Sequence, residues 1–168
     1  MIKIKLINKI VNLNDWVKWL NDKEVTKYSE QRLKRHTHVS QKKFLNKKIK
    51  AKDSKIFQIF FNSNFVGVVE LGNIDKFHNT CEVMYFIGNK KYWGKGVAAS
   101  AINLALKYAF KKLKVYKVFA GTYKKNVASQ KVLTKNKFKL VGKMKNHLRV
   151  LKSSKKIRDD KLIYEKLK

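Results

Sequence analysis

The chain has 168 residues, 44% hydrophobic and 12% aromatic, so it can bury a core, and we expect one domain over residues 1–168. Its 41 Lys and Arg outnumber its 11 Asp and Glu, but the net charge of +30 is mostly lysine spread along the sequence. Nucleic-acid surfaces favour the arginine fork, and no helix-turn-helix, zinc or RNA-binding motif is present. These features argue against a basic nucleic-acid-binding module.

The single cysteine, Cys81, excludes an intramolecular disulfide and favours a reducing cytoplasm. The segment from Met1 to Leu6 alternates polar and apolar residues, which is not typical of a secretory signal. No run of 18 apolar residues occurs, so no membrane-spanning helix is predicted. We therefore expect a cytoplasmic protein.

The first fifty residues predict one strand followed by two helices. The alternation from Ile2 to Leu6 indicates a strand. Asn14 is a suitable N-cap for a short helix, and Ser40 precedes a second segment with apolar residues at helical spacing. The polar stretch Glu30 to His38 between them is expected to be a loop.

The middle of the chain predicts a hairpin and then a strand that leads into a long helix. Ile56 to Phe61 and Phe65 to Leu71 are strand-like and flank an Asn-Ser-Asn turn. A third strand, Cys81 to Gly88, runs into the glycine-containing segment Lys91 to Gly96. From Val97 onwards apolar residues recur with a helical period, so the order is strand, glycine loop, helix.

The last third predicts more sheet around one short helix. Val115 to Thr122 reads as a strand, and Asn126 is suited to cap the helix that follows. Further strand-like segments are Phe138 to Val141, Leu148 to Leu151 and Leu162 to Leu167. The whole array predicts a mixed α/β (α+β) fold.

A glycine-bearing turn between a strand and a helix can bind phosphate, because free N–H groups and the positive helix end converge there. Gly94 and Gly96 lack a Cβ and let the backbone approach an anion closely, while Lys91 and Lys95 add positive charge. Two glycines alone are also compatible with an ordinary turn, since the segment lacks the other glycines of a P-loop or a dinucleotide fingerprint.

The segment Lys91-Tyr92-Trp93-Gly94-Lys95-Gly96 resembles the Q/RxxGxG/A motif of the GNAT superfamily of N-acetyltransferases. Lys91 replaces the usual Gln or Arg, which keeps the charge but loses the planar donor fork. Further on, Asn126 to Phe138 is similar to the second GNAT signature, with Lys137 where glycine is expected. The Trp-Gly-Lys-Gly sequence is most similar to the motif in the branch of ribosomal-protein N-terminal and amino-sugar acetyltransferases.

This resemblance implies a GNAT fold, with a mostly antiparallel mixed sheet, flanking helices and splayed strands that form an acetyl-CoA cleft. It implies a transferase that passes acetyl to a primary amine by direct attack, without a metal. Cys81 is then expected to be a buried strand residue and not a nucleophile. The residues that would bind acetyl-CoA are Phe86, Ile87, Lys91, Tyr92, Trp93, Gly94, Lys95, Gly96, Val97, Ala98, Asn126 and Ser129.

Direct attack requires a base for the amine and a donor for the departing thiolate. By the resemblance, Glu82 is the first candidate for the base and Glu70 the second, although both could be solvated strand carboxylates. Leu133 stands where many members of the family have the tyrosine that protonates the thiolate, so Ser129 is the candidate donor. The amides near Phe86 would hold the pantetheine arm, unless they are hydrogen-bonded to a neighbouring strand. Asn126 would contact the coenzyme, unless it serves only as a helix cap.

The polar stretch before residue 38 would cover the acceptor side in this family. Arg and His can clamp phosphate and Gln and Thr can read hydroxyls, which favours an amino sugar or a nucleotide-linked amino sugar as acceptor. The alternatives are the N-terminal amine of a ribosomal protein, or a merely solvated loop. We expect a monomer or homodimer. The acceptor-side residues are Tyr28, Glu30, Gln31, Arg32, Arg35, His36 and Thr37.

Overall fold

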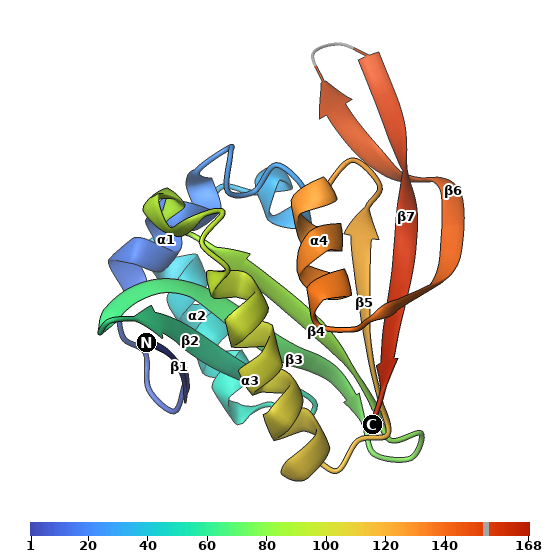
Figure 1. Cartoon of the computed structure of the whole chain (residues 1–168). Helices are drawn as coiled ribbons and strands as arrows, with labels where there is room; N and C mark the ends of the chain where they lie inside the picture. Colours follow the sequence, from blue (N-terminus) through green and yellow to red (C-terminus); the bar gives the residue numbers. More distant parts are fainter. Residues whose placement is uncertain (153–154) are drawn as a thin grey trace.

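The computed structural model describes residues 1–152 and 155–168, which form one seven-stranded sheet with helices on both faces (Figure 1). The strand order is β1-β2-β3-β4-β5-β7-β6, and only β4 and β5 pair in parallel. The strands are β1 (Ile2–Leu6), β2 (Lys55–Phe61), β3 (Asn64–Asp75), β4 (Thr80–Ile87), β5 (Lys117–Tyr123), β6 (Lys139–Lys152) and β7 (Lys155–Leu167). The helices are α1 (Leu13–Asn21), α2 (His38–Lys50), α3 (Val97–Lys111) and α4 (Val127–Lys135), with short 3₁₀ turns η1 (Glu30–Leu33) and η2 (Lys90–Tyr92).

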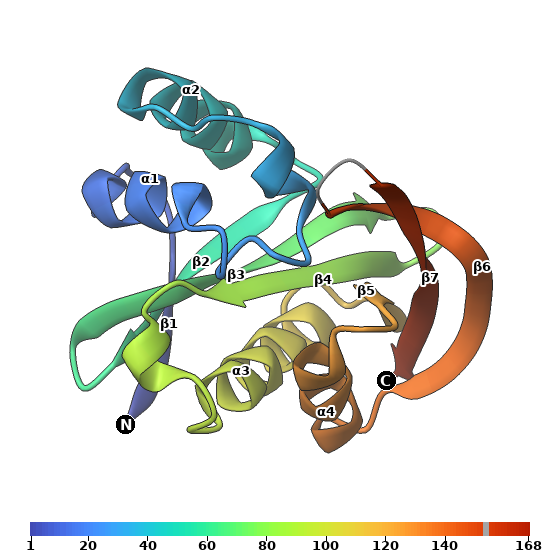
Figure 2. The ribbon, with the colours of Figure 1, turned by 90° about the horizontal axis from the view of Figure 1, so that it is seen from above.

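The helices cover the sheet in two pairs. Seen from above, α1 and α2 lie on one face and α3 and α4 on the other (Figure 2). The larger apolar core lies under α3 and includes Ile102, Val69 and Leu133, whereas Trp16 and Leu45 anchor a smaller core under α1 and α2. Among the described residues no helix is both long and apolar enough to cross a bilayer.

The parallel pair β4 and β5 separates soon after it forms. The pairing covers only Thr80, Cys81 and Glu82 of β4, opposite residues 117–119 of β5. Beyond Glu82 the two strands diverge toward their C-terminal ends (Figure 1). The edge of β4 that faces β5 therefore has no strand partner in the described chain after this point, and its backbone groups remain open to a ligand.

Most predicted elements are confirmed, but two helix starts were wrong. The N-cap of α1 is Asn12, in the left-handed region with φ of 55°, and not Asn14. The helix α2 begins earlier than predicted because Thr37 is its N-cap, and Ser40 completes a capping box with it. The segments predicted as separate strands at 138–141 and 148–151 belong largely to the single bulged strand β6.

Candidate active site

The turn before α3 has the geometry of an anion site. Gly94 and Gly96 have φ of 73° and 74°, in the left-handed region that favours glycine. A Cβ at either position would meet nothing within 4 Å, so the space above both residues is open. Gly96 caps α3, and the first helical amide to find a backbone acceptor is that of Ser100, which donates to the Gly96 carbonyl at 3.1 Å.

The amides of this turn divide into two groups. Those of Tyr92 and Trp93 donate to the carbonyls of Asn89 and Lys90 at 3.1 Å. Within residues 1–152 and 155–168, no protein acceptor receives the N–H groups of residues 94–96. Because these free amides adjoin the positive end of α3, they fit the pyrophosphate of coenzyme A.

The side chains of the glycine loop either fix it or remain exposed. Tyr92 packs against Phe61 with ring centroids 5.2 Å apart, and the Trp93 indole donates to the Ile87 carbonyl at 2.7 Å. Lys91 and Lys95 are exposed. One ring contact and one indole hydrogen bond therefore hold the loop in place, while its two lysines stay available to an anion. Val97 is buried, and Ala98 is half-buried at the helix start.

The open edge of β4 presents different amides from those expected. The amide of Gly88 donates to the Val66 carbonyl of β3 at 2.9 Å. Since amides alternate along an antiparallel strand, the N–H of Phe86 also points to β3, whereas those of Tyr85 and Ile87 point to the open side. The expectation for the Phe86 amide was therefore wrong, and the Tyr85 amide was missed. Because amide directions alternate along a strand, the expected role of the Ile87 amide would have indicated the same role for the Tyr85 amide.

Tyr85 and Ser129 face each other across the opening between β4 and α4. Their hydroxyl oxygens lie 2.8 Å apart. Burial raises the pKa of Tyr85 to about 12, against the opposing effect of the Ser129 hydrogen bond. The Ser129 amide donates to the Asn126 side chain at 3.2 Å, so Asn126 caps α4 as predicted. Leu133, one turn further along, is fully buried.

The two carboxylates proposed as the base occupy different settings. Glu70 accepts from Lys48 and from Ser54, both at 2.7 Å, and its side chain is 15% exposed. Glu82 lies where β4 and β5 separate and accepts from Asn73 at 2.8 Å. Glu70 is thus engaged in a shielded ion pair, while Glu82 has no cationic partner among the described residues.

Cys81 is fully buried beneath α3, as predicted, and desolvation raises the pKa of its thiol to about 12. A thiol that stays protonated cannot act as a nucleophile at neutral pH. In the described part of the chain, no three His, Cys, Asp or Glu side chains gather in a way that could bind a metal ion.

The acceptor-side residues are mostly engaged with protein partners. The Arg32 guanidinium donates to the Ser29 carbonyl at 2.6 Å, to the Tyr123 hydroxyl at 2.9 Å and to the Arg149 carbonyl at 2.8 Å. Tyr123, which the sequence did not single out, donates to Glu30 at 2.7 Å. Desolvation and this Glu30 contact raise the pKa of Tyr123. These bonds join η1 to β5 and β6.

The remaining acceptor-side residues have smaller roles in this network. Tyr28 packs on Tyr123 with ring centroids 5.7 Å apart. The His36 ring contacts the Gln31 carbonyl at 3.0 Å, and Thr37 caps α2. The side chains of Gln31 and Arg35 are exposed. Arg32 and His36 therefore spend part of their hydrogen-bonding capacity on protein partners, which leaves fewer donors for a phosphate clamp.

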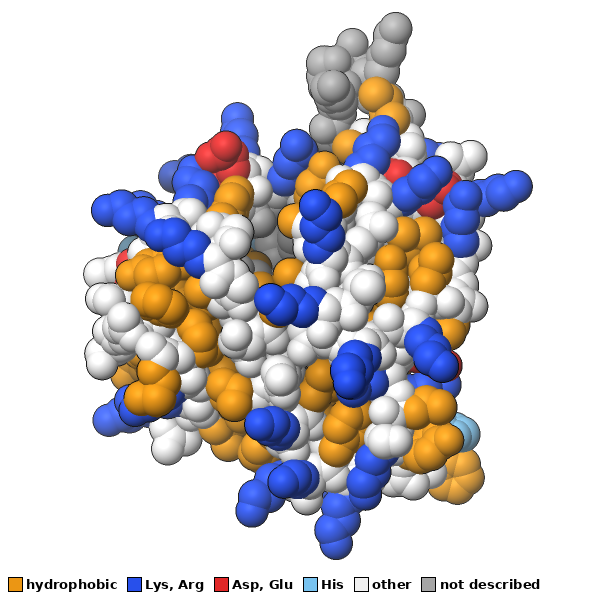
Figure 3. Space-filling view, viewed as in Figure 1, with side chains coloured by type: hydrophobic (Ala, Val, Ile, Leu, Met, Phe, Trp, Pro, Cys, Tyr) orange, Lys and Arg blue, Asp and Glu red, His pale blue; other side chains and the backbone are white. Residues whose placement is uncertain are grey.

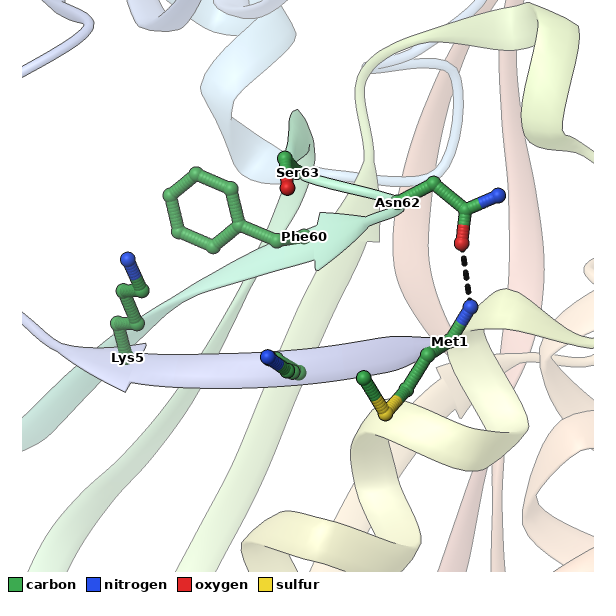
Figure 4. A pocket seen from close by; sticks show the side chains of 6 residues that line it. Met1, Lys5, Phe60, Asn62 and Ser63 are labelled. Atoms are coloured by element: carbon green, nitrogen blue, oxygen red, sulfur yellow. Dashed lines mark hydrogen bonds between the residues drawn. The ribbon is translucent and has the colours of Figure 1, made fainter.

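Two other surfaces lie apart from this site. A shallow pocket is lined by residues of β1, of β2 and of the turn between β2 and β3, and in it the N-terminal amine donates to the side chain of Asn62 (Figure 4). On the face in Figure 3, Lys and Arg side chains are scattered among apolar ones and do not form one patch. The pocket's linings are Met1, Lys3, Lys5, Phe60, Asn62 and Ser63.

A sheet whose parallel strands part beside a glycine loop with free amides is suited to a phosphate-bearing ligand, as an acyl-CoA-dependent transferase requires. The chain belongs to the GNAT acetyltransferase family, since residues 9–139 match its acetyltransferase (GNAT) domain. This membership confirms the predicted fold and the enzyme class, whose members use acetyl-CoA as the acetyl donor.

Several relatives carry names or titles that specify an activity. The chain is 32% identical over 97 residues to the Bacillus subtilis protein named Probable N-acetyltransferase YjcK, and 29% identical over 99 residues to spermidine N(1)-acetyltransferase of Escherichia coli K12. These matches cover 56% and 59% of the chain and 53% of each relative, so the chain spans about half the length of each.

The fold also matches a solved structure of spermidine N-acetyltransferase from Vibrio cholerae in complex with CoA and spermine. The TM-score is 0.84 at 21% identity, over 97% of this chain and 94% of that one. The narrower resemblance to ribosomal-protein and amino-sugar acetyltransferases is not supported by these relatives, because two of the three are spermidine enzymes and the third has no named acceptor.

Proposed function

We propose that the protein transfers the acetyl group of acetyl-CoA to a primary amine of a small polyamine such as spermidine. The observation that supports the transferase activity is the set of unpaired amides of residues 94–96, which lie at the positive end of α3. These amides bind the pyrophosphate, and Lys91 and Lys95 add charge. The bound coenzyme then extends along the open edge of β4.

The open edge of β4 positions the reacting carbonyl. The N–H groups of Tyr85 and Ile87 donate into this space and polarise the thioester carbonyl as negative charge develops on its oxygen. Glu82, at the point where the strands separate, takes the proton from the attacking amine directly or through water. We prefer Glu82 to Glu70 because Glu70 is neutralised by Lys48. Asn126 positions α4 beside the coenzyme.

The polyamine acceptor is supported by two observations. Two named relatives act on spermidine. In this chain Glu30 is an exposed carboxylate on the acceptor side that accepts a hydrogen bond from the Tyr123 hydroxyl, and a carboxylate suits an ammonium group. The engagement of Arg32 by three protein oxygens disfavours the phosphorylated amino sugar that the loop composition had suggested.

The test is a substrate panel with the purified protein. Release of free coenzyme A thiol would be followed with acetyl-CoA and spermidine, spermine, glucosamine, a nucleotide-linked amino sugar or a peptide with a ribosomal-protein N-terminus. We expect turnover with the polyamines and none with the sugars or the peptide. Turnover restricted to another acceptor would overturn the polyamine assignment but keep the transferase. A protein that fails to bind coenzyme A in calorimetry would overturn both.

A further inference from the structure

The usual proton donor of this reaction has no counterpart on α4. Leu133 occupies its position, and its side chain is fully buried in the main core. A thiolate leaving the tetrahedral intermediate still needs a proton or a strong hydrogen-bond donor. The donor must therefore be another side chain that borders the opening between β4 and α4.

Only one pair of hydroxyls in the described chain bridges this opening. The Tyr85 side chain projects from β4 on the same face as Cys81 and Val83, toward α3 and α4, and its hydroxyl lies 2.8 Å from that of Ser129. Both residues are half-buried, so the pair is reached from the opening and not sealed in the core. The Tyr85 amide points to the open edge of β4, so the amide and the hydroxyl of this one residue both border the opening.

The chemistry of the two hydroxyls sets the direction of their hydrogen bond. Either hydroxyl can donate this hydrogen bond, and because a phenol is a stronger acid than an aliphatic alcohol, we take Tyr85 as the donor to Ser129. The Ser129 proton is then free to point at a third atom. Burial raises the pKa of Tyr85 to about 12, so the phenol keeps its proton at neutral pH until a base arrives.

We infer that Tyr85, acting through Ser129, supplies the proton that the coenzyme A thiolate takes up as it leaves. This inference rests on the proposed function. As the C–S bond breaks, its electron pair stays on sulfur, which takes the Ser129 proton while Ser129 takes the proton of Tyr85. The phenolate is reprotonated from water, and the proton lost by the amine through Glu82 returns to water, so protons balance over one cycle.

The first measurement compares Tyr85→Phe and Ser129→Ala with wild type. Tyr85→Phe removes one oxygen and keeps the ring, and the matched control is Tyr108→Phe, whose ring packs on Phe57 away from this opening. We expect kcat to fall about 10²-fold in Tyr85→Phe and in Ser129→Ala, with coenzyme A affinity in calorimetry within about twofold of wild type. Tyr108→Phe is expected to keep the wild-type kcat.

The second measurement separates proton donation from a structural role. Tyr85 would be replaced by fluorinated tyrosines, which keep the shape and hydrogen bond but lower the phenol pKa stepwise. If the phenol donates its proton, kcat varies systematically with that pKa. A kcat that does not change across the series, or a Tyr85→Phe enzyme with wild-type kcat, would overturn the inference.

A binding readout makes the outcome independent of turnover. Ultraviolet absorbance reports ionisation of the bound coenzyme A thiol. Hydroxyl donors directed at sulfur lower the pKa of this thiol, so we expect a lowered value in wild type that returns toward the free value in Ser129→Ala. If the bound thiol has the same pKa in both proteins, Ser129 does not donate to the sulfur and the inference is overturned. In that case normal turnover with spermidine would leave the proposed function intact, whereas absent coenzyme binding would remove both.

Discussion

The two sides of the candidate active site use their polar groups in opposite ways. On the coenzyme side, the amides of residues 94–96 and the open edge of β4 have no protein acceptors among the described residues. On the acceptor side, Arg32, Tyr123 and Glu30 bond to each other, and Thr37 and His36 fasten the loop to its surroundings.

This difference shows which groups supply the free energy of ligand binding. Unpaired amides at a helix start gain their hydrogen bonds only when an anion arrives, so they favour binding directly. Paired side chains must exchange one partner for another, so their net contribution to affinity is small. We therefore expect substitutions at β4 and the glycine loop to have large effects, and those in the acceptor loop to have small ones.

The largest effect is expected at Glu82. Glu82→Gln keeps the size of the side chain and its contact with Asn73 but removes the base, so kcat with spermidine should fall about 10²- to 10⁴-fold. Coenzyme A affinity in calorimetry should stay at the wild-type value.

Glu70→Gln is the matched control on the neighbouring strand. It breaks the ion pair with Lys48 and should lower the free energy of unfolding by about 1 kcal/mol while kcat stays within a few-fold of wild type. Thermal unfolding and initial rates measure the two effects. If Glu70→Gln loses more activity than Glu82→Gln, the roles of the two carboxylates are reversed.

The next effect is expected at Gly96. Gly96→Val places methyl groups in the open space above the turn and forces a branched side chain into a φ of 74°. Coenzyme A affinity should fall about 10²-fold because the phosphates can no longer reach the amides, and stability should drop by about 1 to 2 kcal/mol. Calorimetry and thermal unfolding separate the two losses.

Gly142→Ala is the control for an added Cβ. Its new methyl group would make ordinary contact with Ile163 at 3.5 Å, and its φ lies outside the left-handed region. Coenzyme A affinity should be unchanged in this variant. Wild-type affinity in Gly96→Val would mean that the phosphates lie elsewhere.

A smaller effect is expected at Glu30. Glu30→Gln should raise the KM for spermidine about two- to fivefold, the range of an exposed ion pair, without changing the KM for acetyl-CoA. Arg35→Gln removes a charge from the same loop and should leave the KM for spermidine unchanged. A rise in KM for a phosphorylated acceptor in Arg35→Gln, with no effect of Glu30→Gln, would instead support the sugar nucleotide.

The contrast between the two sides also explains what could be predicted from the sequence. The turn at Gly94 and Gly96 was found because its chemistry depends on backbone conformation, which glycine spacing encodes locally. The start of α4 was found for the same reason, since Asn126 caps it through a residue three positions away.

The acceptor side could not be predicted because its contacts join distant residues. Arg32 meets Tyr123 and the carbonyl of Arg149, 91 and 117 positions away, and no local pattern reports that its fork is occupied. The pairing of Tyr85 with Ser129 likewise requires β4 and α4 to be placed in space. Strand alternation alone, however, would have assigned the open amides to Tyr85 and Ile87.

The smallest effect is expected at Cys81, which lies on β4 next to Glu82 but faces the core. Cys81→Ala should retain the wild-type kcat and lower the free energy of unfolding by about 1 kcal/mol, because only packing is lost. In the wild type the buried thiol, with its pKa raised to about 12, should react with a thiol reagent at pH 8 at least a hundredfold more slowly than in urea. Rapid labelling of the folded protein, or a large loss of kcat in Cys81→Ala, would place this side chain in the active site. The two faces of β4 would then have to be exchanged. The pairing of Glu82 with Phe119 beside that of Cys81 with Val118 opposes such a register.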